Sequence, residues 1–336
     1  MAEGAASDLP DFIRSFERQL RLKNLAPRTI VSYLQAARLM TDWLVARYGP
    51  VDADDVTAEH LREYFRHLQE GPKLLVRTTR AGATTVPSED AKRAAATVAG
   101  HYRTLQQFFK YLVEEGDIPG SPLAALPRPK VPDKPVPVVK DHELEALFKS
   151  VGSKDFASRR DNAIFRLFLD CGVRLDELGR LAVESLDFTT DEIVVWGKGR
   201  RPRIVPFSEK TGVALERYLR ERRRHPAADL RFASDDPDDP RNGNRPLWLG
   251  ARGWLTGSGV YQIIRKRSRA ALGEHVHPHQ LRHTAAHQHA AAGMSETDMM
   301  RVFGWRSSEM PKRYGSSAAD ERAREAKRRL GLGNRY

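Results

Sequence analysis

Apolar residues in the first third of the chain recur at helical spacing. One stripe predicts a helix that begins at Pro27, where a first-turn proline is tolerated, and ends at Gly49 and Pro50. The members of this stripe recur three, four or seven residues apart: Ile30, Leu34, Ala37 and Leu44. Thr57 is expected to cap a further helix, and a long helix is expected over about 90–115. The first region is therefore predicted to be a small helical bundle, with a flexible loop at 71–89, where Gly, Pro, Thr and Ser are frequent.

A proline-rich run separates this bundle from the rest of the chain. Five prolines lie between Leu126 and Lys140, and such spacing excludes helix and central strand and is typical of an extended linker. We therefore place a helical domain at 1–126, a linker at 127–140 and a second domain at 141–316. Helical patterns dominate the second domain, but DEIVVWGKGRRPRIVPF predicts a β-hairpin and ASDDPDDPRNGNRP a surface loop. The fold class is mainly α with a small β-hairpin or sheet.

The charge balance indicates the kind of partner. A formal net charge of +12 favours a polyanion, and nucleic acid is the leading candidate, because each contacted phosphate releases condensed counterions. A basic membrane-surface protein is the alternative, but the chain has no apolar run of about 18 residues and no signal-type segment near Met1. We expect a cytoplasmic protein without membrane contact. The single cysteine, Cys171, excludes an intramolecular disulfide and a zinc site of paired cysteines, and its apolar neighbours predict a buried thiol.

Four places in the second domain carry side chains suited to chemistry, and the first is CGVRLDELGRL. Gly172 is predicted to close one helix in a left-handed cap and Asp176 to open the next. Arg174 would then lie on the connecting turn with its guanidinium free to point into a cleft, braced by Glu177. The alternative is an arginine in an ordinary surface ion pair.

The second place is Lys198 at the expected hairpin tip, in WGKGRRPRIVPF. An ammonium flanked by glycines can be carried into a groove, where it can meet a phosphate or protonate a leaving oxygen if its pKa is lowered. A merely solvated lysine is the alternative at such a tip.

The third place is the histidine-rich stretch HPHQLRHTAAHQH, which is predicted to be helical from about Pro278. His279, His283 and His287 would share one face at a spacing that could hold zinc. Arg282 argues against zinc, because a guanidinium beside a cation site is unfavourable. His279 with Arg282 suits phosphate better, since arginine grips two oxygens and histidine donates or shuttles a proton. Exposed or core-filling roles are expected for a further set of histidines: His275, His277, His287 and His289.

The fourth place is MMRVFGWRSSEMPKRYGSS, in which Tyr314 follows Trp305 by nine residues. A lone tyrosine usually packs in a core with its hydroxyl hydrogen-bonded. Tyr314 is instead flanked by Ser and Gly in a polar stretch, so we expect it to lie in a loop with little around it to pack on.

These residues, taken together, resemble the tyrosine recombinase, or phage integrase, family. The matching motifs, in register over roughly 160 residues, are VRLDEL, WGKG, HPHQLRHT, FGW and the tyrosine nine residues after the tryptophan. The N-terminal region resembles the core-binding domain of Xer-type proteins and simple integrases. The resemblance implies a helical, SAM-like core-binding domain followed by a catalytic domain that breaks and rejoins DNA.

The resemblance also implies a chemistry without metal or cofactor. Tyr314 would attack a phosphodiester and become linked to its 3′-phosphate, and a 5′-hydroxyl from another strand would later reseal the DNA. Arg174 and Arg282 would stabilise the charge of the transition state, Lys198 would act as the general acid and His279 would assist proton transfer. Trp305 stands where many relatives have histidine, and its indole N–H donates a hydrogen bond but shuttles no proton.

The partner implied by the resemblance is double-stranded DNA with a core site, flanked by inverted repeats. The tail at 317–336 has apolar residues at helical spacing and is predicted to form a short helix. In relatives such a helix docks on the neighbouring protomer, which implies a tetramer on DNA; folding back on its own domain is the alternative. Two other functions stay open, a type IB topoisomerase and a DNA-binding protein without catalysis, but the complete catalytic set argues against the second.

Overall fold

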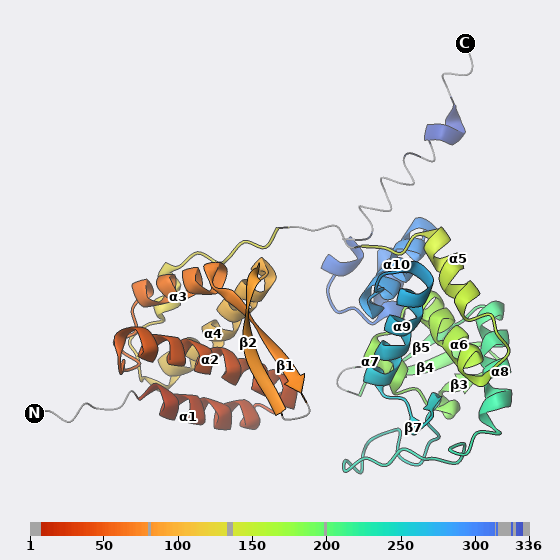
Figure 1. Ribbon diagram of the computed structural model, residues 1–336, viewed down its shortest axis with the longest axis horizontal. Coiled ribbons are helices and arrows are strands. Elements are labelled where there is room, and N and C mark those ends of the chain that lie inside the picture. The colour runs from red at the N-terminus through yellow and green to blue at the C-terminus, as the bar shows by residue number, and fades with distance from the viewer. Residues whose placement is uncertain are drawn as a thin grey trace, which may run out of the picture. The chain divides into compact units, whose positions relative to one another are not determined.

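The chain folds into two compact units, Met1–Lys134 and Pro135–Tyr336. The computed structural model describes residues 8–79, 82–132, 137–197, 200–312, 314, 324 and 327–331. The division between the units falls inside the proline-rich run, and each unit has its own hydrophobic core (Figure 1).

The first unit is built on helices. They are α1 (Leu9–Leu22), α2 (Pro27–Tyr48), α3 (Ala58–Glu70), α4 (Ala95–Glu115) and the 3-10 turn η1 (Pro122–Ala125). As predicted, α2 begins at Pro27 and ends at Gly49, and the Thr57 hydroxyl caps α3 by accepting a hydrogen bond from the backbone N–H of His60 at 3.2 Å. Packed rings, among them those of Phe16 and Phe108, bring α1 and α4 together in the core. The predicted bundle is therefore confirmed.

The stretch expected to be a loop is an antiparallel hairpin instead, formed by β1 (Pro72–Thr79) and β2 (Gly82–Lys92). Its register pairs β-branched residues such as Val76 with Thr85, and such residues favour strands. The glycine, proline and serine content of the stretch indicated a loop, and this interpretation was wrong. Both strands of a two-stranded sheet are edge strands, and proline is tolerated there. Because β2 extends to Lys92, α4 begins at Ala95 and not near residue 90.

The second unit is mostly helical around small sheets. Its helices are α5 (Asp141–Ser150), α6 (Phe156–Cys171), α7 (Leu175–Gly179), η2 (Val183–Ser185), α8 (Glu209–Arg222), α9 (Gly257–Leu272), α10 (Pro278–Ala291) and α11 (Glu296–Phe303). Its strands are β3 (Leu186–Asp187), β4 (Glu192–Trp196), β5 (Pro202–Pro206), β6 (Leu249–Gly250) and β7 (Gly253–Trp254). The predicted hairpin is confirmed as β4–β5, with β3 added on its other edge, and the acidic stretch at 233–245 is a surface segment without helix or strand.

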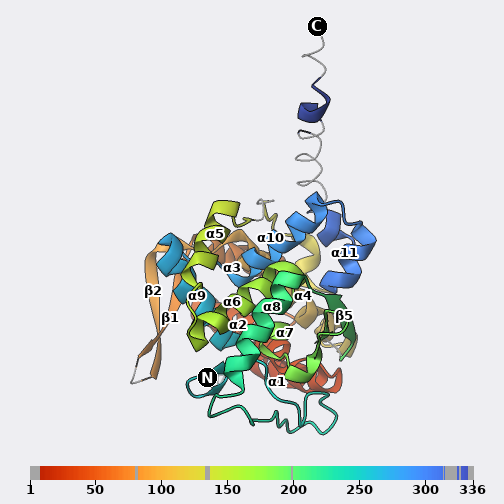
Figure 2. The ribbon, with the colours of Figure 1, turned by 90° about the vertical axis from the view of Figure 1, so that its right-hand side faces the viewer.

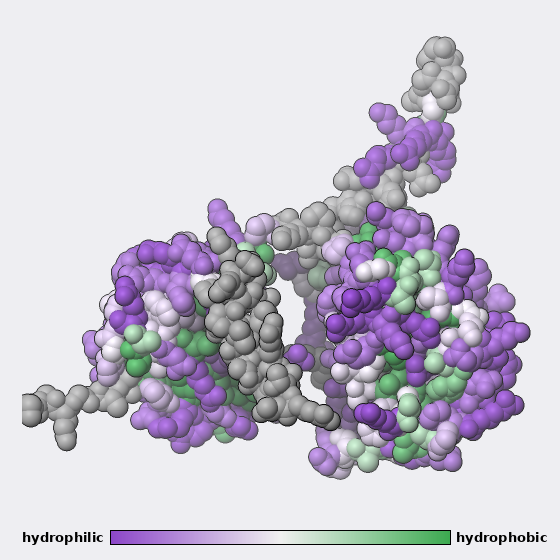
Figure 3. Space-filling model, in the orientation of Figure 1, coloured by the Kyte–Doolittle hydropathy of each residue, from purple (hydrophilic) through white to green (hydrophobic). Residues whose placement is uncertain are grey.

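Helix α6 is the centre of this unit, since α8, α9 and α10 all pack against it (Figure 2). Cys171 at its end is fully buried, as predicted, and burial raises the pKa of the thiol well above its ordinary value. None of the described helices is long and apolar enough to cross a membrane. Hydrophilic residues cover most of the visible surface of each unit (Figure 3).

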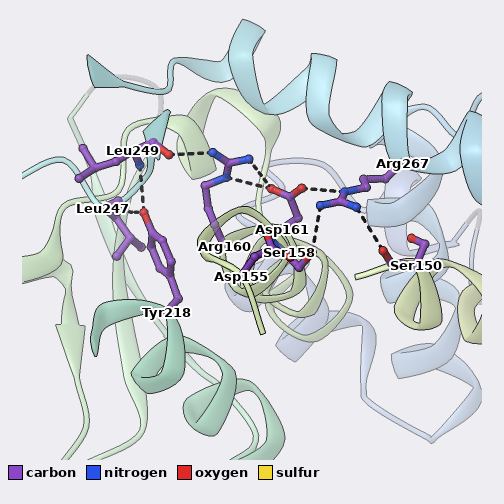
Figure 4. A network of polar contacts seen from close by, with 9 residues as sticks. All are labelled: Ser150, Asp155, Ser158, Arg160, Asp161, Tyr218, Leu247, Leu249 and Arg267. Atoms are coloured by element: carbon purple, nitrogen blue, oxygen red, sulfur yellow. Dashed lines mark hydrogen bonds and ion pairs between the residues drawn. The ribbon is translucent and has the colours of Figure 1, made fainter. Parts of the chain in front are cut away.

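A buried network of charges fixes α9 on α6 (Figure 4). Asp161 accepts hydrogen bonds from Arg160 at 2.7 Å and from Arg267 of α9 at 2.8 Å. Arg160 also donates to the carbonyl of Leu249 at 2.9 Å, and Arg267 donates to the carbonyl of Ser150 at 3.2 Å. The network therefore joins α5, α6, β6 and α9 around the N-terminal half of α6, and the candidate site lies at the other end of that helix.

Candidate active site

The candidate site begins where α6 ends. Gly172 adopts the left-handed conformation (φ +54°), as predicted, and a Cβ there would lie 2.1 Å from the ring of Phe303. The turn delivers Arg174 as the N-cap of α7. The expectation that Asp176 opens this helix is wrong: the backbone of Arg174 is already extended, and its own N–H donates to the Glu177 carboxylate at 2.8 Å. Asp176 lies in the first turn, beside the positive end of the helix dipole.

Glu177 is the carboxylate that organises the site. It is buried, and it accepts a hydrogen bond from the guanidinium of Arg174 at 2.8 Å, as predicted. Two further bonds come from Arg203, at 3.0 and 2.7 Å. Burial by itself raises the pKa of Glu177, but the hydrogen bonds and charge of Arg203, together with the hydrogen bonds of Arg174, outweigh it and lower the pKa to about 2. Glu177 is therefore ionised at every pH at which the protein would be used.

Arg203 was not predicted from the sequence. The only signal for it is the alternation of β5, in which the exposed Ile204 separates Arg203 from the buried Val205, so that a cation occupies a position on the inward face. An arginine at an inward position of a strand needs a buried partner. That partner, Glu177, lies 26 residues earlier in the sequence, and no local pattern connects the two.

Arg282 projects from α10 into the same place and is buried. Its guanidinium donates hydrogen bonds to the carbonyl of Gly172 and, at 2.6 Å, to that of Phe303. It also lies over the rings of Phe303 and Trp305, 5.4 and 5.6 Å from their centroids. The C-terminal ends of α6 and α11 are thereby joined through one side chain.

The electrostatics of Arg282 favour an anion. Burial, and then the positive charges of Arg174 and Arg203, lower its pKa to about 9, while Glu177 opposes that shift. Arg282 stays charged at neutral pH. Three guanidinium groups thus surround one carboxylate, and the excess positive charge in a largely desolvated place is what a phosphate group would neutralise.

Tyr314 lies beside this cluster, but its surroundings differ from the prediction. It is buried and helical, and its ring stacks on Trp305 with centroids 5.4 Å apart and packs on His283 at 5.4 Å. The flanking Ser and Gly gave the impression of an open loop, whereas α10 and the segment that follows α11 supply the rings that cover Tyr314. Its hydroxyl is buried and has no hydrogen-bond partner within the described residues. An unpaired buried hydroxyl is costly for a structural tyrosine.

Of the remaining predicted residues, His279 and Trp305 lie at or near this cluster. His279 is exposed in the first turn of α10, and its ring lies 6.3 Å from that of His283. Trp305 is buried between Phe303 and Tyr314. Lys198 lies outside the described residues, although β4 and β5 lead to and from its position. Of the other histidines, His275 and His277 are exposed and His289 packs on Phe303.

Comparison with known proteins identifies the family of the chain. The model of the phage integrase family matches residues 137–321, more than half of the chain, and the model of the phage integrase N-terminal SAM-like domain matches residues 12–83. The chain belongs to the phage integrase family of tyrosine recombinases. Among its relatives, this integrase is 31% identical over 279 residues to the tyrosine recombinase XerC of Oceanobacillus iheyensis, covering 82% of this chain and 81% of that protein.

Solved structures show the same fold. The integrase of the Tn1549 transposon, in complex with transposon right end DNA, matches with a TM-score of 0.68 at 19% identity, over 95% of this chain and 99% of that one. The XerH recombinase bound to its palindromic difH substrate matches with a TM-score of 0.67 at 15% identity, over 93% and 84% of the two chains. At these identities the likeness concerns the fold of this integrase and not its substrate.

Proposed function

We propose that this site-specific tyrosine recombinase cleaves DNA by attack of the Tyr314 hydroxyl on a phosphodiester. The bond between the tyrosine oxygen and phosphorus forms while the bond to the 5′-oxygen breaks, which leaves a 3′-phosphotyrosyl link and a 5′-hydroxyl. The observation that carries the proposal is the cluster of three arginines around one carboxylate, next to a buried tyrosine whose hydroxyl has no hydrogen-bond partner in the described part of the chain. A second 5′-hydroxyl reverses the step, so no external energy source is needed.

The roles of the other residues follow from their chemistry. Arg174 and Arg282 would hold the non-bridging oxygens and stabilise the charge of the transition state, in place of a metal ion. His279, exposed at the start of α10, would assist transfer of the tyrosine proton. Trp305 would donate its indole N–H to a phosphate oxygen. Lys198 would give a proton to the departing 5′-oxygen.

The Lys198 role predicts a chemical rescue. Lys198→Met is expected to slow cleavage of an ordinary duplex by about 10²–10⁴-fold, because a general acid contributes about that much. With sulfur in place of the departing 5′-oxygen, the leaving group is a good one without a proton, and the variant should cleave at nearly the wild-type rate. Measuring both rates in single turnover checks the role. An equal defect on both substrates would show that Lys198 does not protonate the leaving group.

Double-stranded DNA is the proposed substrate. The matched structures include recombinases bound to DNA, and this chain carries a net charge of +12. We propose that the helical unit at 1–126 and the catalytic unit at 141–316 contact the same duplex across the linker at 127–140.

Such binding should depend steeply on salt. With about six to ten phosphates contacted, affinity is expected to fall about 10³–10⁵-fold between about 50 and 200 mM salt. Titration of a labelled duplex at four salt concentrations gives the slope. A flat response would contradict extensive phosphate contact.

A tetramer assembled on inverted repeats is the finer part of the proposal. The tail at 317–336, most of which lies outside the described residues, would dock on a neighbouring protomer. Deleting the residues after Ser317 should then abolish cooperative assembly on a two-site duplex while a single site is still bound. Unchanged cooperativity in a native gel would exclude tail exchange.

The function itself is tested on genomic DNA. The protein is incubated with DNA from its source and denatured, and the protein-linked ends are sequenced, with Tyr314→Phe as the control. Recurrent attachment points between inverted repeats would support site-specific recombination. Scattered attachment points would instead support topoisomerase-like relaxation, and no attachment from active, folded protein would contradict the proposed chemistry.

A further inference from the structure

Two arginines share Glu177, but they differ in how much of each remains accessible. The Arg174 side chain is 40% exposed, whereas that of Arg203 is 12% exposed. Arg174 uses one nitrogen for Glu177 and another for the carbonyl of Gly304, at 2.8 Å each. Arg203 turns both ends of its fork to Glu177. Arg174 is therefore the one of the pair that a ligand can reach.

Arg203 also connects three elements that carry the site. It stands on β5, it binds Glu177 of α7, and its Nε donates to the carbonyl of Val302 in α11 at 2.9 Å. Gly304 lies two residues further along, with φ +63°, and a Cβ there would lie 3.1 Å from Arg203 and 3.3 Å from Arg174. Both guanidinium groups thus pack against the backbone that leads to Trp305 and Tyr314.

We propose that Arg203 is a positioning residue for the recombinase reaction. It holds Glu177 between two guanidinium groups and thereby keeps Arg174 aimed at the scissile phosphate, without touching the phosphate itself. The inference rests on the proposed function, because it assigns Arg174 to the phosphate. Arg203 is not among the site residues that the sequence motifs predict.

Removing Arg203 would change the ionisation of Glu177. Its hydrogen bonds and charge are the largest of the effects that keep the pKa of Glu177 low against burial. Without them the pKa of this buried carboxyl rises, and Glu177 is left to pair with Arg174 alone. Arg174 is then drawn wholly into that pair at neutral pH, and it loses its partner when Glu177 takes up a proton in mild acid.

The test compares Arg203→Met and Arg203→Lys with Arg220→Met, which removes an exposed arginine on α8. For each protein we would measure duplex affinity, thermal unfolding and the single-turnover cleavage rate from pH 5 to 8. Arg203→Met is expected to cleave about 10–100-fold more slowly, with affinity changed by less than about threefold, as for loss of a group that orients a transition-state donor. Arg203→Lys should recover part of the rate, because it keeps the charge but not the fork. Arg220→Met should match the wild type.

The pH profile separates positioning from mere support of the fold. Glu177 is fully ionised from pH 5 to 8 in the wild type, so its titration does not lower the cleavage rate of that protein toward pH 5. Arg203→Met should show an additional loss of rate toward pH 5, and this loss should vanish in the double variant Arg203→Met with Glu177→Gln, which has no carboxylate to protonate. An unchanged rate, or a loss independent of pH and of Glu177, would overturn the proposal and make Arg203 either dispensable or a direct phosphate ligand.

Two controls allow the Arg203 experiment to be interpreted. If Arg203→Met does not fold, Arg203→Lys carries the same comparison of pH profiles. Cleavage by wild type and its absence in Tyr314→Phe test the proposed function separately. Should wild type form no adduct, the function fails, and Arg203 is judged on acid unfolding: the low pKa of Glu177 adds stability above about pH 4.5 that is lost as pH falls toward 2, and Arg203→Met should lack this contribution.

Discussion

Tyr314→Phe is expected to abolish covalent attachment to DNA, on the order of 10⁴-fold or more, while the protein binds DNA as before. The substitution removes one oxygen, and the ring keeps its stacking on Trp305 and its contact with His283. The hydroxyl has no hydrogen-bond partner within the described residues, so its loss breaks no bond there and relieves a buried unpaired group. The free energy of unfolding should therefore stay the same or rise by up to about 1 kcal/mol.

A tyrosine in the other unit gives the matched control. Tyr102 donates its hydroxyl to the carbonyl of Leu126 at 3.0 Å, so Tyr102→Phe should lose about 1 kcal/mol of stability and still cleave DNA. A nicked duplex that traps the covalent complex measures attachment, and thermal unfolding measures stability. If Tyr314→Phe were destabilised like Tyr102→Phe and still became attached, Tyr314 would be a packing residue and another group would be the nucleophile.

Arg282→Lys is expected to give the second largest effect, a fall in cleavage rate of about 10²–10³-fold. A lysine keeps the positive charge, but its single ammonium cannot bond the carbonyls of Gly172 and Phe303 and two phosphate oxygens at fixed angles. The excess positive charge around Glu177 is largely retained in this variant. DNA affinity should therefore change little, and the loss should appear in the chemical step.

The matched control for Arg282 is another buried arginine that donates to backbone carbonyls. Arg222 on α8 bonds the carbonyls of Pro246 and Ala228, at 2.6 and 3.1 Å. Arg222→Lys should lower the melting temperature in the same way as Arg282→Lys but leave the cleavage rate unchanged below that temperature. Equal cleavage by the two variants would mean that Arg282 serves the fold alone.

The sequence predicted most reliably what depends on short motifs. Arg174 follows a glycine cap, and Arg282 is the fifth residue of a helix that begins at Pro278, so the local chain sets the position of each. The bracing of Arg174 by Glu177, three residues away, was predictable for the same reason. The bundle and the β4–β5 hairpin were predictable from the periodic spacing of apolar residues, which are buried in the hydrophobic cores.

What the sequence did not predict depends on long-range packing. Arg203 meets Glu177 only because β5 folds beside α7, and Tyr314 is buried only because rings from α10 and from the segment that follows α11 cover it. Composition misled in the β1–β2 hairpin, where strand pairing outweighed residues typical of loops. The shared carboxylate is thus a tertiary feature, and the charge excess that suits phosphate becomes visible only in three dimensions.

The proposed mechanism is tested most directly by identifying the two atoms that are linked in the covalent complex. A trapped covalent complex is digested with protease and nuclease, and the peptide that carries nucleotide is sequenced by mass spectrometry. We expect a 3′-phosphonucleotide on the oxygen of Tyr314 and a free 5′-hydroxyl on the released strand. A nucleotide on any other residue, or a tyrosine linked to a 5′-phosphate, would contradict the proposed mechanism.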